Sequence, residues 1–268
     1  MNRQDPGGDE LTQLSEAAAE AARIGGAVLQ EWIGRFSVRE KGRANLVTDA
    51  DEASQAAIVN YLRNLFPEHG FLGEENLNDR TEGGFESPGF WIIDPLDGTT
   101  NYVHQFPYYA VSIGFFAAGR IQVGVVFDPA RNELFSAAAG RGATLNAHPI
   151  RTSGETDPAR ALAVASLPTA VTPDNPAIRR FLQALSHLQT VQRTGSAALN
   201  LAYVAAGRID GFWSTSLYPW DVAAGVLLVQ EAGGVVTGLT GDPVDIFVPD
   251  LLAASSPSLQ TKLSQVLA

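Results

Sequence analysis

The segment 91–101 reads WIIDPLDGTTN and places two carboxylates, Asp94 and Asp97, three positions apart at the end of an apolar stretch. The apolar residues predict a strand that delivers Asp94 at its end, where Pro95 bends the chain. Mg²⁺ prefers hard oxygen ligands and binds through a few carboxylates, with water and substrate phosphate completing its shell. Asp94, Asp97 and the Leu96 carbonyl between them supply such ligands. The segment therefore predicts a magnesium site.

A short helix is expected to follow, because Gly98 permits a tight backbone turn before Thr99. The N–H groups of Gly98 and Thr99 at the start of that helix are then placed to hold phosphate oxygens. Asp-Pro and Asp-Gly are also common turn dipeptides, and either pair alone indicates only a turn. The complete segment favours metal and phosphate binding.

Acidic residues recur in three further segments, each of which also has an ordinary explanation. Glu74 and Glu75 follow an apolar pair and, taken alone, indicate a solvated loop. The segment 48–52 (TDADE) opens a helix, where a Thr or Asp cap and acidic first-turn residues are favourable. Asp221 also stands at a helix start and can serve as its cap. Only the four segments together indicate a shared site.

The elements that must position these residues fall into two groups. Helical periodicity covers 11–32 and 50–66, and aromatic and β-branched runs then predict an antiparallel sheet from 90–93, 109–117, 121–127 and 133–139. Beyond Gly154 strands and helices alternate, with strands at 163–167, near 191, near 212 and at 235–237, and helices at 176–188, 197–206 and 221–232. Ser256 and Pro257 predict the N-cap and first residue of a closing helix.

This pattern predicts an α/β (mixed α+β) chain that folds as one unit over 1–268. We expect a seam near residue 150. Subdomain 8–150 would carry two helices, the antiparallel sheet and the main metal site, and subdomain 151–268 would be an α/β layer that completes the metal and substrate site.

Composition narrows the class of function. The formal net charge of −11 argues against a nucleic-acid partner, because phosphate backbones are bound by clustered Lys and Arg. A phosphate substrate would need local positive charge, for which bound metal is the obvious source, although acidic surfaces also simply keep proteins soluble. The absence of cysteine excludes disulfides, thiolate nucleophiles and Cys-ligated zinc. The polar start and the lack of a long apolar stretch predict a cytoplasmic protein that does not span a membrane.

Taken together, the chain resembles the inositol monophosphatase family, within the larger group of lithium-sensitive, metal-dependent sugar-phosphate phosphatases. WIIDPLDGTTN at 91–101 and WDVAAG at 220–225, followed by EAGG at 231–234, look like its two hallmark motifs. The resemblance runs from about residue 11 to the C-terminus and takes in further short matches at 41–42, 46–48, 73–75, 195–198 and 205–208. It implies the layered αβαβα sandwich shared with fructose-1,6-bisphosphatase, and a homodimer.

The resemblance also implies roles for individual residues. The ligands of two or three Mg²⁺ ions would be Glu74, Asp94, the Leu96 carbonyl, Asp97 and Asp221. Asp51 and Thr99 would orient and deprotonate the attacking water, with Glu74 contributing to catalysis. Lys41 would sit on a mobile loop over the metals, or be an ordinary surface lysine, and Glu75 would lie next to the ligands. Phosphate and substrate would be bound by Asp97, Gly98, Thr99, Ser196, Ala197, Ser214 and Asp221.

One position departs from the family pattern. Relatives that use inositol phosphate carry Glu seven positions before the Asp of the Trp-Asp motif, where it binds ring hydroxyls, and here that residue is Ser214. This puts the substrate in question but not the hydrolysis. Ser196 can also be a plain N-cap, and Trp213 and Tyr218 either flank a larger leaving group or belong to the core.

Several functions stay open. The leading substrate is inositol 1-phosphate, and the alternatives are histidinol phosphate, fructose 1,6-bisphosphate, a 3′-phosphonucleotide and NADP⁺. A phosphatase forming an aspartyl-phosphate on Asp49 leaves the 94–101 segment unexplained, and a serine hydrolase lacks a Gly-x-Ser-x-Gly elbow. A non-catalytic regulatory or partner-binding protein is the alternative from another class.

Overall fold

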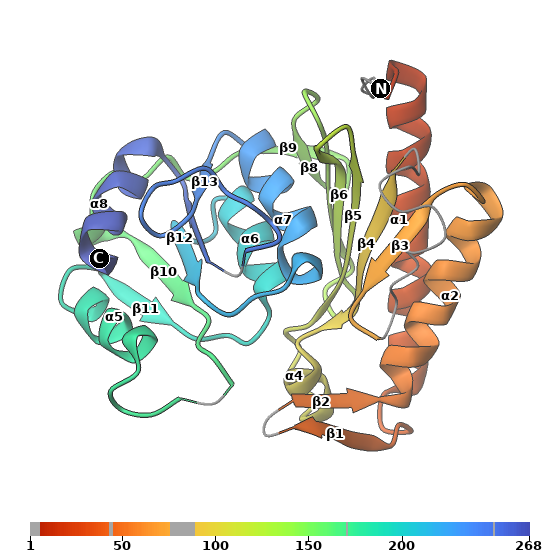
Figure 1. Ribbon diagram of the computed structural model, residues 1–268, viewed down its shortest axis with the longest axis horizontal. Coiled ribbons are helices and arrows are strands. Elements are labelled where there is room, and N and C mark those ends of the chain that lie inside the picture. The colour runs from red at the N-terminus through yellow and green to blue at the C-terminus, as the bar shows by residue number, and fades with distance from the viewer. Residues whose placement is uncertain (1–5, 43–44, 76–88, 170, 249) are drawn as a thin grey trace.

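Two β-sheets alternate with three layers of helices in the computed structural model, which describes residues 6–42, 45–75, 89–169, 171–248 and 250–268 (Figure 1). Helices α1 and α2 form one outer layer, α6 and α7 lie between the sheets, and α5 and α8 form the other outer layer. The αβαβα sandwich expected from the sequence is therefore confirmed.

The first sheet has seven strands in the order β3-β4-β5-β6-β7-β8-β9. Its strands are β3 (Gly70–Gly73), β4 (Phe90–Asp97), β5 (Ala110–Ala117), β6 (Arg120–Asp128), β7 (Glu133–Ala138), β8 (Ala143–Leu145) and β9 (His148–Ile150). All neighbouring pairs are antiparallel except β3 with β4. The antiparallel sheet predicted from 90–93, 109–117, 121–127 and 133–139 is thus confirmed, and β3, which was not predicted, adds a parallel strand at its edge.

Helices α1 (Gly8–Trp32) and α2 (Asp49–Leu65) cover the outer face of this sheet. Glycines permit the close fit: a Cβ on Gly25 would lie 2.6 Å from Ile58 Cδ1 of α2, and one on Gly26 would lie 2.5 Å from the ring of Phe127 on β6. The helix therefore approaches both partners where a larger residue would force them apart.

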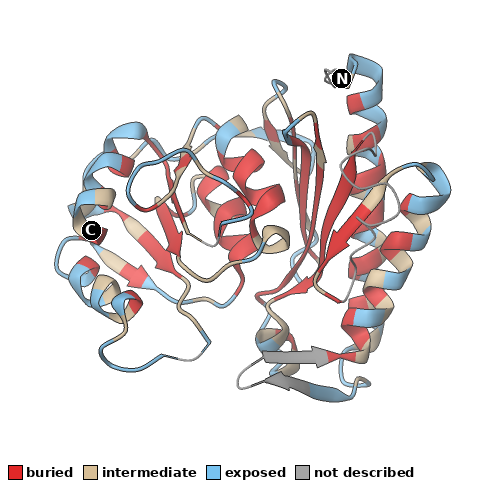
Figure 2. Cartoon of the chain, in the orientation of Figure 1, coloured by how far each residue is buried: buried red, intermediate tan, exposed pale blue. Residues whose placement is uncertain are grey.

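The middle layer consists of α6 (Ala197–Ala205) and α7 (Pro219–Glu231), both rich in alanine and leucine. Most residues of both helices are buried (Figure 2). A helix buried on nearly all sides is apolar on all sides, as these two are. Gly124 on β6 faces α7, and a Cβ there would lie 2.6 Å from the Ala224 carbonyl oxygen. This close approach brings the start of α7 to the first sheet.

The second sheet has the order β11-β10-β12-β14-β13. Its strands are β10 (Leu162–Ala165), β11 (Thr190–Gln192), β12 (Gly211–Ser214), β13 (Val235–Thr237) and β14 (Leu251–Ala254). Helix α5 (Pro176–Leu185) and helix α8 (Pro257–Leu267) lie against each other on its outer side. The Ser256 hydroxyl accepts from Leu259 N at 3.2 Å, which confirms the predicted N-cap.

Smaller elements complete the chain. A 3₁₀ turn covers Pro158–Arg160, helix α4 covers Thr99–Val103, and a hairpin of β1 (Val38–Gly42) and β2 (Asn45–Thr48) leads into α2 next to α4 (Figure 1). Within the described ranges, no helix is long and apolar enough to cross a membrane. The division of the chain near residue 150 stays a prediction.

Candidate functional site

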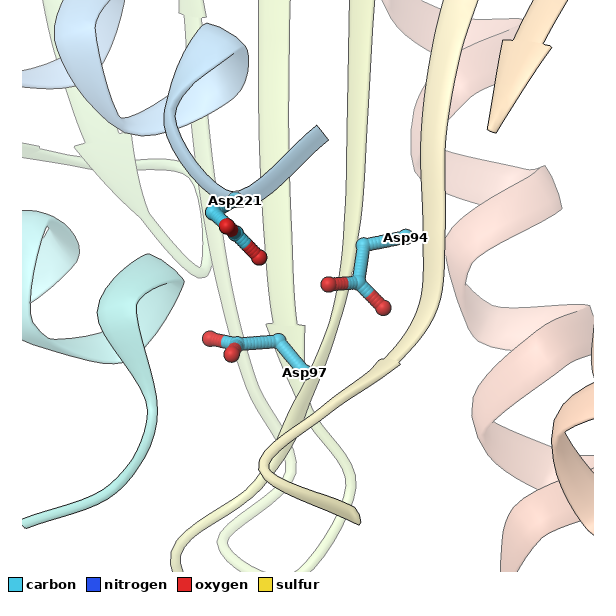
Figure 3. A group of neighbouring side chains, drawn as sticks. All are labelled: Asp94, Asp97 and Asp221. Atoms are coloured by element: carbon cyan, nitrogen blue, oxygen red, sulfur yellow. The ribbon is translucent and has the colours of Figure 1, made fainter. Parts of the chain in front are cut away.

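Three carboxylates from two elements converge between the first sheet and the middle helices. Asp94 and Asp97 extend from β4 and Asp221 from the first turn of α7, and an oxygen of each lies within 4.8 Å of an oxygen of the others (Figure 3). Asp94 and Asp97 are buried and Asp221 is half-buried. Three residues separated by up to 127 positions in the sequence therefore form one cluster.

A β-bulge explains how Asp94 and Asp97 share a face. Side chains alternate between the two faces of a strand, so residues three positions apart in a regular strand point to opposite sides. Here Asp94 pairs with Ser112 and Asp97 pairs with Ala110, so β4 contains one more residue than β5 between the two pairs. The extra residue resets the alternation and turns both carboxylates to the same side.

The start of α7 is fixed to the sheet beside these residues. Ser112, the cross-strand partner of Asp94, donates its hydroxyl to the Trp220 carbonyl oxygen at 3.1 Å. Asp221 in turn accepts from the backbone N–H of Tyr218, the N-cap residue, at 2.7 Å. Asp221 therefore stabilises its own helix start, as its position suggested, while its carboxylate also points into the cluster.

Glu74 reaches the site from the neighbouring strand. Because β3 and β4 run parallel with Gly73 opposite Ile93, Glu74 follows the end of β3 at the level of Asp94 in β4. Gln55 of α2 holds this segment through both backbone groups of Glu75, donating to its carbonyl at 2.9 Å and accepting from its N–H at 3.3 Å. Glu74 lines the same cavity as Asp97 and Asp221.

The electrostatics of the cluster suit a divalent cation. Burial, together with repulsion from Glu74, Asp97 and Asp221, raises the pKa of Asp94 well above its usual value. Burial and repulsion from Asp97 likewise raise the pKa of Asp221. Neighbouring buried carboxylates destabilise the fold when they are all charged. A shared divalent cation that prefers oxygen ligands offsets this repulsion. The residues present therefore fit Mg²⁺.

Asp97 is held by the helix on its far side. The Ser196 hydroxyl donates to Asp97 Oδ2 at 2.6 Å and the Ala198 N–H donates to the same oxygen at 2.7 Å. Burial raises the pKa of Asp97 to about 6, and these hydrogen bonds limit the rise. Ser196 is also the N-cap of α6, accepting from Leu199 N.

A separate carboxylate lies on the α2 side. The Asp51 carboxylate accepts from the backbone and hydroxyl of Thr48, the N-cap residue, in a capping box. Its other oxygen, Oδ1, lies 3.4 Å from the Thr99 hydroxyl, which is also 3.1 Å from the Leu96 carbonyl oxygen. Burial raises the pKa of Asp51 to about 6. Asp51 and Thr99 thus meet as the resemblance implied, and Thr48 rather than Asp49 caps the helix.

Gly98 allows the turn after Asp97 to approach the second half of the chain. It has a φ of 96°, and a Cβ there would lie 3.0 Å from the Tyr108 carbonyl oxygen and 3.3 Å from the Gly195 carbonyl oxygen. Asn101, one turn later, donates its amide to the carbonyl oxygens of Tyr108 at 2.7 Å and Thr194 at 2.9 Å. Helix α4 begins at Thr99, as predicted.

A cavity of about 630 Å³ lies beside the cluster and is bordered by Asp97 and Asp221, but not by Asp94, Gly98 or Thr99. Its walls come from both halves of the chain: Glu74, Asp97, Thr100, Asn101, residues 166–169, residues 193–195, Ala197, residues 216–218, Trp220 and Asp221. The cavity is thus open to a small molecule next to the carboxylates.

Some expected site residues lie elsewhere. Ser214 and Ser196 are fully buried and neither borders the cavity, because Ser196 points at Asp97 and Ser214 accepts from Ser216 N at the end of β12. Trp213 is buried in the core around the second sheet. Lys41 falls in β1, but its side chain lies outside the described residues.

Sequence reasoning missed the residues that hold the ligands in place. Ser54 donates to the Pro95 carbonyl oxygen at 3.1 Å inside the bulge, and Ser112, Gln55 and Asn101 make the contacts described above. Isolated polar residues of these types give no signal, since their importance depends on what the fold brings opposite them. The capping box of Thr48 and Asp51 was not predicted either, although an acidic residue three positions after a Thr is a signal for one.

The comparisons with known proteins agree with this geometry. A family model described as the inositol monophosphatase family matches residues 10–268. The inositol-1-monophosphatase of Synechocystis sp. is 41% identical over 264 residues, 97% of this chain and 90% of that protein. The Nus factor SuhB of Pseudomonas aeruginosa is 42% identical over 241 residues, 86% of this chain and 87% of that protein.

Solved structures match as closely. The extragenic suppressor protein SuhB from Bartonella henselae has a TM-score of 0.89 and 36% identity, with 95% of this chain and 98% of that chain covered. The inositol monophosphatase from Anabaena has a TM-score of 0.85 and 41% identity, with 96% of each chain covered.

Proposed function

Because the chain belongs to the inositol monophosphatase family, we propose that it is a Mg²⁺-dependent phosphomonoesterase that hydrolyses a small phosphorylated polyol or sugar. The observation that carries the proposal is the convergence of Asp94, Asp97 and Asp221 within 4.8 Å beside a cavity large enough for such a substrate.

Glu74, Asp94, the Leu96 carbonyl, Asp97 and Asp221 would hold two or three Mg²⁺ ions. Bound Mg²⁺ supplies positive charge that neutralises the phosphoryl oxygens and lowers the pKa of water, which is the main need of phosphoryl transfer. Asp97 is kept charged and oriented for this purpose by the donors of Ser196 and Ala198.

Asp51 and Thr99 act on the attacking water. Asp51 is fully buried, and its Oδ1 lies 3.4 Å from the hydroxyl of the half-buried Thr99. The water passes its proton to Thr99 Oγ1 while Thr99 passes its own to Asp51 Oδ1. The water oxygen then bonds to phosphorus, the ester P–O bond breaks, and the leaving alkoxide is protonated by solvent. No phosphoenzyme is required.

The phosphate would lie at the start of α4, whose first N–H groups, of Gly98 and Thr99, have no partner within the helix, and Ala197 would form another part of the cavity wall. Inositol 1-phosphate is the leading substrate. Histidinol phosphate, fructose 1,6-bisphosphate, a 3′-phosphonucleotide and NADP⁺ are the alternatives, since Ser214 does not supply the carboxylate that binds inositol hydroxyls. We further propose a cytoplasmic homodimer that Li⁺ inhibits.

The test is phosphate release from these five esters with Mg²⁺, with EDTA, and with Mg²⁺ plus Li⁺. Mg²⁺-dependent release that EDTA abolishes supports the proposal. No release from any ester contradicts it, and slower release from inositol 1-phosphate than from the other four contradicts the substrate assignment.

A second role is favoured by the names of several relatives. Nus factor SuhB of Pseudomonas aeruginosa and of Escherichia coli are 42% and 38% identical to this chain. A partner-binding role of that kind does not require turnover. An Asp94→Asn variant expressed in place of the native chain separates the two, because a purely catalytic role would be lost and a purely partner-binding role retained.

A further inference from the structure

The cavity beside the carboxylates is also bordered by residues of the second half of the chain. Its volume of about 630 Å³ lies within the roughly 300–1,000 Å³ typical of small-ligand sites. The wall from the second half consists of residues 166–169, 193–195, Ala197, residues 216–218 and Trp220. If the chain is the phosphatase proposed above, this wall faces the alcohol portion of the substrate.

That wall is poorly equipped to bind a polyol through carboxylates. Among the described residues that border the cavity, the acidic ones are Glu74, Asp97 and Asp221, and all three are assigned to the metal. Ser214 is fully buried. The other polar side chains that border the cavity are neutral or basic, among them Ser166, Thr169 and Arg193, so they can contact hydroxyls but supply no further carboxylate. A different feature of the wall can therefore add to the selection of the alcohol portion.

The feature present is a pair of stacked aromatic rings. Tyr218 and Trp220 lie with ring centroids 4.9 Å apart and planes 10° from parallel, and both border the cavity. Trp220 is half-buried against the core, whereas Tyr218 is 60% exposed. Because Trp220 covers one face of the Tyr218 ring, the exposed surface is its other face and its edge.

The stack is fixed relative to the carboxylates. Tyr218 N donates to Asp221 Oδ2 at 2.7 Å, and the Trp220 carbonyl oxygen accepts from Ser112 at 3.1 Å. Pro219, which separates Tyr218 and Trp220 in the sequence, restricts the backbone at the first position of α7. The Tyr218 ring is therefore exposed to the cavity but fixed in position. Because it is preorganised, little conformational entropy is lost when a flat group stacks on it.

We propose that Tyr218 is a specificity residue that widens the substrate range beyond inositol 1-phosphate, so that the site also accepts a phosphate monoester whose alcohol carries a flat aromatic or heteroaromatic ring. The phosphate binds at the carboxylate end and the ring stacks on the open face of Tyr218. Arg193, on the same cavity wall, would favour an electron-rich or anionic ring substituent.

The test compares two esters that differ only in ring character, 2-phenylethyl phosphate and 2-cyclohexylethyl phosphate, by kcat/KM with Mg²⁺. We expect the native chain to prefer the aromatic ester about fivefold, the size of one stacking contact. Tyr218→Leu should bring the ratio to about one and Tyr218→Phe should preserve it. Phe247→Leu, at an exposed ring that borders a different cavity, is the matched control and should leave the ratio unchanged.

Each other outcome overturns the inference. Equal rates for the two esters in the native chain, or a ratio that Tyr218→Leu does not change, would exclude stacking while leaving the phosphatase function intact. Equal losses for both esters together with a change in elution volume on size exclusion would assign Tyr218 to a subunit interface instead. Absence of Mg²⁺-dependent release from every ester, inositol 1-phosphate included, would reject the proposed function and this inference with it.

Discussion

The Thr99 hydroxyl lies 3.4 Å from Asp51 Oδ1, although 48 positions separate the two residues. Asp51 is fully buried and Thr99 is half-buried at the start of α4, so Thr99 connects a buried carboxylate to the cavity side of the site. A buried carboxylate whose pKa is raised to about 6 is a suitable proton acceptor near neutral pH.

Replacing Thr99 tests this connection. Thr99→Ala should lower kcat about 100-fold, since general-base contributions are typically 100- to 10,000-fold. Thr99→Ser keeps the hydroxyl and should restore most of the rate. Steady-state phosphate release measures both, and equal losses in the two variants would show that the methyl group, not the hydroxyl, is what matters.

Asp94→Asn removes one charge from the carboxylate cluster with little change in shape. The variant should lose Mg²⁺-dependent phosphate release, while its unfolding temperature without metal should rise, because repulsion from Glu74, Asp97 and Asp221 is relieved. The Asn side-chain oxygen can still accept from Leu96 N, which Asp94 Oδ1 does at 3.0 Å. Thermal unfolding in EDTA measures the stability change. Native-like activity in this variant would contradict the ligand assignment.

The stabilising effect of Mg²⁺ should increase with pH. The pKa of Asp97 in the fold is about 6, above the value of about 3.9 for an unfolded aspartate. Between these values the folded chain binds more protons than the unfolded chain, so without metal the free energy of unfolding decreases as pH rises through this window. Mg²⁺ needs the deprotonated carboxylates and compensates for their repulsion.

We therefore expect Mg²⁺ to raise the unfolding temperature more at about pH 8 than at about pH 5. Calorimetric scans with MgCl₂ and with EDTA at matched ionic strength measure the difference at each pH. A shift of the same size at both values would mean that Mg²⁺ does not bind through these carboxylates.

Ser112→Ala should weaken metal binding without touching a ligand. The variant removes the hydrogen bond that fixes the Trp220 carbonyl at the start of α7, so Asp221 is less firmly placed. We expect a loss of about 1 kcal/mol in stability and several-fold weaker Mg²⁺ binding by titration calorimetry. Ser15→Ala, which removes a side-chain hydrogen bond on α1 to Leu11, is the control and should leave Mg²⁺ affinity unchanged.

The sequence was most informative where local pattern determines structure. The apolar run before Asp94, the turn at Gly98 and the periodicity of the long helices predicted β4, α4, α1 and α2 within a few residues. The short strands β1, β2, β3, β8, β9 and β14 were not predicted, because three to five residues carry too little periodicity to distinguish a strand from a loop. The equally short β11 and β13 were predicted from their alternation with helices.

Side-chain roles that depend on distant contacts were harder to predict. Nothing near Ser196 in the sequence indicates that it donates to Asp97, 99 positions away, and it was expected to face the substrate. The bulge between Asp94 and Asp97 depends on the pairing with β5, so it was not predicted, and the shared magnesium site was predicted from a turn at Pro95 instead. Ser214 was placed in the substrate site by its position in a motif, whereas its short side chain stays buried in β12.

Anomalous diffraction from crystals grown with Mn²⁺ in place of Mg²⁺ would show whether the acidic side chains meet around divalent cations. We expect at least one anomalous peak at coordination distance, about 2.2 Å, from carboxylate oxygens of Asp94, Asp97 and Asp221. Ordered side chains in the arrangement of Figure 3 with no anomalous peak among them would contradict it.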